Sequence, residues 1–217
     1  MPPDAFRFSS VVGSGLWAVL LINIAGAGSA VYLVLVVQEM WSFGPTAAGV
    51  LAAVLAVAWS ASSITVANVK SKETRKTLIR IGPAMIGLGL LLVLAGLELD
   101  QVALVVLGQM VTGSGFGLHN GYLSLTMMEA ASDAERDRTS ALLPTTQSAG
   151  NAIGAALAGV AANAAGLATA VSASDVKFAI VPVYVLGAVV AALAVIAAWR
   201  MVGMIRPQDS ASSFAAG

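Results

Sequence analysis

The chain has 217 residues, of which 58% are hydrophobic and 10% charged, and its 11 basic and 11 acidic residues leave no net charge at pH 7. An ordinary soluble domain, with about 25% charged residues, is therefore excluded, as is the strongly basic surface of a nucleic-acid-binding protein. With no cysteine and a single histidine, the chain can form no disulfide, thiol catalyst, thiolate metal site or histidine-based metal centre. We expect no metal and no cofactor.

Six long stretches of the chain carry no Asp, Glu, Lys or Arg: residues 8–38, 40–69, 81–97, 101–128, 139–174 and 178–199. A helix needs about 20 apolar residues to cross a hydrocarbon core about 30 Å thick. All six stretches are long enough if the third also includes Leu78 and Ile79, because Arg80 can extend its charge to the headgroups. We therefore predict a single all-α transmembrane domain over residues 1–217, with spans at about 16–37, 46–69, 78–97, 102–128, 140–165 and 178–201.

Polar side chains are shared unequally among these spans. The first carries Asn23 and Tyr32, with Gln38 at its end, and the second carries several serines, a threonine and an asparagine. The fourth and fifth are also polar, whereas the third and sixth are almost wholly apolar. An unpaired amide in lipid costs several kcal/mol, so the polar spans should face protein or water and the apolar ones lipid. This order predicts two three-helix repeats around a central axis.

The fourth span is the densest in motifs. Gly113, Gly117 and Gly121 recur every four residues, which predicts a face for close helix packing. A second stripe, about 120° around the helix, consists of Gln109, Thr112, Phe116 and His119. Three polar side chains and an aromatic ring on one stripe favour a cavity lining over interhelical hydrogen bonds alone. His119 is either a carrier of a coupled proton or a neutral imidazole packed between helices.

The fifth span repeats this arrangement. Gly150 and Gly154 form a second packing pair, while Gln147 and Asn151 are neighbours on an adjacent face. We predict that the polar helices share one cavity. Its candidate lining residues are Asn23, Tyr32, Gln38, Gln109, Thr112, His119, Gln147 and Asn151.

The basic residues predict the orientation, since lysine and arginine accumulate on the cytoplasmic side. With six spans, one side holds ten of them: Arg7, Lys70, Lys72, Arg75, Lys76, Arg80, Arg136, Arg138, Arg200 and Arg206. The other side holds only Lys177. We expect a multi-pass protein of the cell membrane with both termini in the cytoplasm.

An intramembrane serine protease is the enzyme to exclude, and we expect no enzyme. Such a protease needs a Gly-x-Ser-Gly turn and a histidine on another helix. The strings TGSG at 112–115 and VGSG at 12–15 both lack the first glycine. His119 also follows Ser114 by five residues on the same helix and points elsewhere.

Several stretches resemble the carboxyl-terminal six-helix half of major facilitator superfamily transporters, most closely the drug-efflux and general exporter branches. The stretches are YLVLVVQ at 32–38, FGPTAAGV at 43–50, GSGFG at 113–117, RTSA at 138–141 and QSAGNAIG at 147–154. The resemblance covers about residues 16–204. The basic loop at 70–76 lacks the glycine and the Asp-Arg-x-Gly core of the family's loop motif.

The resemblance implies secondary export of a small molecule by alternating access, with substrate at the midplane between two six-helix halves. This chain supplies one half. It either pairs with itself or with a separate first-half chain, or it is a truncated, non-transporting membrane protein or interaction subunit. The expected partners are the lipid bilayer, a second half and a small-molecule substrate, with no nucleic acid.

Overall fold

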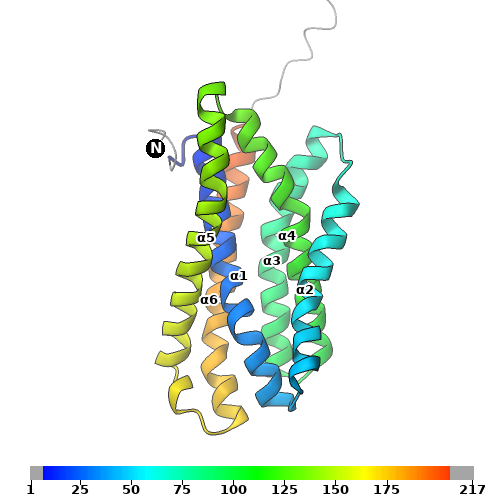
Figure 1. Ribbon diagram of the computed structural model, residues 1–217, viewed down its shortest axis with the longest axis vertical. Coiled ribbons are helices and arrows are strands. Elements are labelled where there is room, and N and C mark those ends of the chain that lie inside the picture. Colours follow the sequence, from blue (N-terminus) through cyan, green and yellow to red (C-terminus); the bar gives the residue numbers. More distant parts are fainter. Residues whose placement is uncertain (1–6, 206–217) are drawn as a thin grey trace, which may run out of the picture.

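The computed structural model describes residues 7–205, except for the side chains of residues 133–135, and this part of the chain folds into six α-helices and one short 3-10 helix (Figure 1). Helices that follow one another in the sequence run in opposite directions (Figure 1). Their bounds are α1 Val11–Trp41, α2 Pro45–Val66, α3 Lys72–Glu98, α4 Val102–Ala130, α5 Asp133–Ala164, η1 Leu167–Thr169 and α6 Ala173–Gly203.

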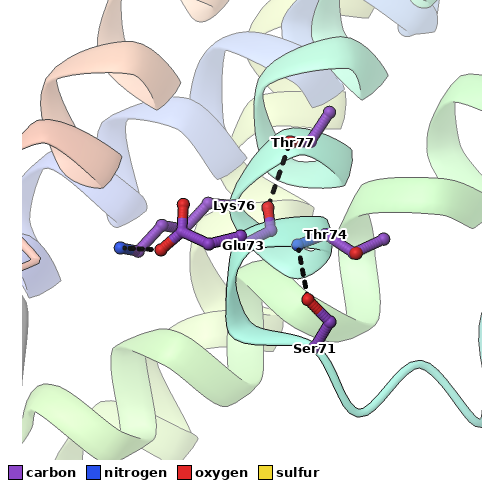
Figure 2. Close-up of polar contacts among 5 residues, drawn as sticks. All are labelled: Ser71, Glu73, Thr74, Lys76 and Thr77. Carbon is purple, nitrogen blue, oxygen red and sulfur yellow. Dashed lines mark hydrogen bonds and ion pairs between the residues drawn. The ribbon is translucent and has the colours of Figure 1, made fainter. Parts of the chain in front are cut away.

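Short polar residues fix several helix ends. Ser10 Oγ accepts a hydrogen bond from Gly13 N at 2.9 Å at the start of α1, and Pro45 occupies the first turn of α2, where its missing N–H costs least. At the start of α3, Ser71 Oγ accepts from Thr74 N at 3.3 Å (Figure 2). These caps satisfy backbone groups that a helix end leaves unpaired.

Five of the described helices, α1, α2, α3, α4 and α6, are long and apolar enough to cross a membrane. They agree with five of the predicted spans. The remaining predicted span, the fifth at 140–165, falls in α5, which is not among those five helices. The physical reason is its composition, since Gln147, Asn151 and Asn163 interrupt a run of alanine and glycine that is only weakly apolar.

The helices form two groups joined along one side. α1 packs on α5 and α6, α4 packs on α2 and α3, and α3 packs on α6. Figure 1 shows α1, α5 and α6 on the left and α2, α3 and α4 on the right. Apolar side chains of α1, α3, α4 and α6 fill the centre, including Leu16, Ile22, Ile86, Leu90 and Tyr184.

Glycines bring the backbones of α3 and α4 close together along much of their length. Gly82, Gly89 and Gly96 recur every seven residues along α3, so they lie on one side of the helix. A Cβ atom on Gly96 would lie 2.8 Å from Val105 N, and one on Gly108 would lie 2.7 Å from Gly89 O. The two backbones can approach this closely only because side chains are missing at the contact.

The two helices expected to face lipid, α3 and α6, are covered more fully by the rest of the chain than α2 is. Within the single chain, 11% of the apolar window of α2 is buried, against 39% for α3 and 44% for α6. The reason is that α3 and α6 pack on each other, so each is shielded on its inner side. α2 and α5 lie at the free edges of the two groups instead.

Candidate binding cavity

A cavity of about 360 Å³ lies at mid-depth between α1, α2, α4 and α5. These are the four helices whose polarity predicted a shared lining. The residues around it are Val19, Ile22, Asn23, Gly26, Ala27, Ala30, Leu55, Trp59, Phe116, His119, Asn120, Gln147 and Asn151. The volume is at the lower end of the range for small-molecule sites, about 300–1,000 Å³.

Two stacked aromatic rings form one wall of the cavity. The centroids of Trp59 and Phe116 are 5.4 Å apart with 29° between their planes, which is offset stacking. The His119 ring continues the row at 6.2 Å from Phe116. Gly26 on α1 leaves room for the Phe116 ring, because a Cβ there would lie 3.0 Å from the ring's Cζ. The wall offers flat apolar surface across two helices.

Amide and imidazole groups provide the polar part of the lining. Asn23 Nδ2 donates to Val19 O at 2.8 Å within its own helix. His119 is 2% exposed, and its Nδ1 lies 2.6 Å from Gly115 O. Because a carbonyl oxygen only accepts, Nδ1 carries the hydrogen, and in the neutral ring Nε2 is left as an acceptor. Gln147 and Asn151 add two primary amides from α5.

None of the described residues lining the cavity is Asp, Glu, Lys or Arg. A charged ligand would meet no opposite charge here and would lose its hydration. Stacked rings with amide donors and acceptors instead suit an uncharged aromatic or amphipathic molecule. Such a ligand would gain apolar contact from Trp59 and Phe116 and orientation from the amides.

Four of the eight predicted lining residues lie in this cavity: Asn23, His119, Gln147 and Asn151. The structure places the other four elsewhere. Gln109 is 1% exposed and donates to Ser29 Oγ at 3.0 Å, because α1 approaches α4 at that level. Thr112 is fully buried against Gly89 of α3.

Tyr32 and Gln38 also lie outside the cavity. Both are further along α1 than its lining part, which ends at Ala30. The Tyr32 hydroxyl lies 3.7 Å from where a Cβ of Gly159 would stand, so it faces α5. Gln38 is half-buried near the end of α1.

The glycines singled out for packing separate into two sets. Gly113 and Gly117 touch the backbone of α2, at Leu55 O and Trp59 O. On α5, Cβ atoms at Gly150 and Gly154 would lie 2.7 Å from Leu20 O and 2.6 Å from Ile24 O of α1. Gly121, predicted on the same face as Gly113, is exposed, and nothing lies within 4 Å of its Cβ position. At this level α2 and α4 are no longer in close contact.

Sequence reasoning missed Trp59 and Asn120 as lining residues. Asn120 follows Phe116 by four residues and so shares its side of α4. Trp59 stands on the only span with a central tryptophan, opposite Gly117 of α4, which its own backbone contacts. Both features can be read in the sequence, but only the packing of α2 on α4 shows that Trp59 and Asn120 face the same cavity.

Comparison with known proteins finds partial relatives. Over 165 residues, which are 72% of this chain and 35% of each relative, the chain is 30% identical to two proteins named probable multidrug-efflux transporter, from Mycobacterium tuberculosis strains CDC 1551 / Oshkosh and ATCC 25618 / H37Rv. The chain therefore matches about a third of the length of these relatives. No family model and no solved structure matches it.

Proposed function

We propose that this chain forms one half of a secondary transporter that exports an uncharged aromatic or amphipathic small molecule. The observation that carries the proposal is the cavity between α1, α2, α4 and α5, with two stacked rings, four side-chain amides and no charged side chain in its lining. The partial similarity to multidrug-efflux transporters supports export as the activity.

The helix contacts support an arrangement of two inverted three-helix repeats, as in major facilitator transporters. If α1, α2 and α3 correspond to α4, α5 and α6, the contacts of α1 with α5 and α6 become those of α4 with α2 and α3. The remaining large contact, α3 with α6, maps onto itself. Because each repeat has three helices, corresponding helices run in opposite directions, as α1 and α4 do in Figure 1.

The cavity in this half has one open side, so we propose that a second six-helix half completes it. The second half is either another copy of this chain or a separate chain. The relatives are long enough to contain such a second half, since this chain matches 35% of their length. Rocking of the two halves would then expose the cavity to alternate sides of the membrane.

Export is tested by replacing one ring of the cavity wall. Phe116→Leu keeps an apolar side chain but removes the stacking with Trp59, and should reduce efflux of an aromatic substrate about two- to tenfold, since aromatic pairs contribute about 0.5–1.5 kcal/mol. Phe178→Leu is the matched control. Phe178 is 72% exposed near the start of α6, far from the cavity. Efflux is measured as the decline of an accumulated fluorescent substrate in cells. Equal efflux in both variants and wild type would contradict the cavity as the transport site.

We further propose the cell membrane as the location, with both termini in the cytoplasm. Cysteine at Val171, which is 94% exposed in the η1–α6 turn, should react in intact cells with a membrane-impermeant maleimide. Cysteine at the exposed Asn68, between α2 and α3, should react only after lysis. The native chain has no cysteine, so each signal comes from one site. The physical reason is the excess of lysine and arginine around the second position, and the reverse labelling would overturn the orientation.

A further inference from the structure

The basic end of α3 holds two arginines, Arg75 and Arg80, that differ in their hydrogen bonding. Arg75 Cζ lies 5.3 Å from the centre of the Tyr122 ring, and Arg75 Nε donates to Val69 O at 2.9 Å. Arg80 Cζ similarly lies 5.1 Å from the centre of the Trp199 ring of α6. Arg80 Nε, however, is buried and has no hydrogen-bond partner among the described residues. A buried donor on a cation without a partner costs free energy, unless something outside the chain accepts its hydrogen bond.

The surroundings of Arg80 are basic and contain one carboxylate that is already engaged. Lys76 Nζ lies 2.8 Å from Glu73 Oε1, and Figure 2 shows these two side chains projecting together from the first turns of α3. Lys76 and Arg80 are one turn apart on the same side of the helix. Arg200 follows Trp199 on α6. An anionic group at Arg80 would therefore meet a positive surrounding.

The surface next to Arg80 and Trp199 is apolar. On α6, Leu193, Ile196 and Trp199 are 49%, 57% and 57% exposed, and on α3, Ile81 and Leu88 are 43% and 53% exposed. These side chains lie on the two helices that meet at Arg80. An acyl chain could rest along them while its headgroup stays at the arginine, which a free phosphate ion has no need to do.

We propose that Arg80, Trp199 and Lys76 form a binding site for the phosphate of an anionic phospholipid, at the α3–α6 seam on the basic end of the chain. The guanidinium of Arg80 donates to a phosphate oxygen. The Trp199 ring holds the guanidinium in place by cation–π contact. The site does not depend on transport or on a second half, because neither helix belongs to the cavity.

The test measures lipid selectivity of the purified full chain with any partner that copurifies. The protein is placed in nanodiscs of equimolar phosphatidylglycerol and phosphatidylcholine, and the lipids it retains are counted by native mass spectrometry. Wild type should retain phosphatidylglycerol over phosphatidylcholine in a ratio of about 5:1, as expected for one interfacial arginine. Arg80→Gln should abolish this enrichment. Lys70→Gln removes the same charge from an exposed residue at the same end and should keep it.

Trp199→Leu provides a second variant, at an exposed position where folding is not at risk, and should lower the enrichment as well. Equal loss in Arg80→Gln and Lys70→Gln would overturn the site, because the effect would then follow net charge alone. No enrichment in wild type would overturn it too. Inorganic phosphate that binds at Arg80 in detergent, in a protein with no preference between the two lipids, would assign the site to a soluble phosphate and contradict the lipid proposal.

Discussion

Replacing Gly117 with alanine is expected to destabilise the fold by about 1–3 kcal/mol, the cost of forcing a methyl group into a filled contact. A Cβ at Gly117 would lie 2.5 Å from Trp59 O, 2.8 Å from Ser62 Cβ and 3.0 Å from Ser63 N. Two of these neighbours are backbone atoms, which no side-chain rotation can move. α2 must therefore shift away from α4, and Trp59 with it, so the stacking with Phe116 is also expected to be lost.

Gly121→Ala is the matched control, since it is the same change one turn further along the same helix. Nothing lies within 4 Å of the Cβ position there, and alanine favours a helix over glycine by up to about 1 kcal/mol. This variant should be as stable as wild type or slightly more stable. The measurement is the midpoint of thermal unfolding in detergent, at about 2–4 °C for each kcal/mol. A drop of equal size in both variants would contradict the α2–α4 contact.

The positions of the helices could be predicted from the sequence because hydropathy and charge are local properties. The span predicted at 102–128 agrees with α4 at Val102–Ala130, and the one at 78–97 lies within α3. The predicted third and sixth spans were placed correctly, but their contact with each other was not predicted. Exposure depends on which helix covers which, and the contact of α3 with α6 leaves no mark in the polarity of either helix.

Only part of the predicted lining lies in the cavity, again because the sequence pattern of one helix does not show which other helices it meets. The predicted stripe of α4 contains both Gln109 and His119, and the sequence does not show which of them lies at the level of the cavity. Because α1 comes close to α4 at Ser29, Gln109 bonds across the contact, whereas His119 stands where α1 leaves room. Likewise the glycine face of α4 was predicted, but not that α2 and α4 are no longer in close contact at the level of Gly121.

The chain is expected to be isolated with a second six-helix half and not as a monomer. Asn151 is exposed and Gln147 half-buried on the open side of the cavity, and in lipid each unpaired amide would cost several kcal/mol. Val57 of α2 and Val160 of α5, both 67% exposed, lie on the helices at the free edges of the two groups. Light scattering with the detergent subtracted, after mild extraction, should give the mass of a homodimer or of a complex with a first-half chain.

Photo-crosslinking locates the interface without assuming which partner is present. A benzophenone amino acid at Ala56 or Ser148, exposed residues one turn from the cavity-lining Trp59 and Asn151, should form a crosslink to the second half in native membranes. The controls are Leu88 of α3 and Leu193 of α6, which are 53% and 49% exposed and should crosslink to lipid only. The difference is expected because α2 and α5 flank the open cavity, whereas α3 and α6 already cover each other. Crosslinks to protein from Leu88 and Leu193 but not from Ala56 and Ser148 would place the partner on the opposite side of the chain. A monomer that crosslinks to protein at none of the four positions would contradict the second half, because the exposed amides would then be tolerated in lipid.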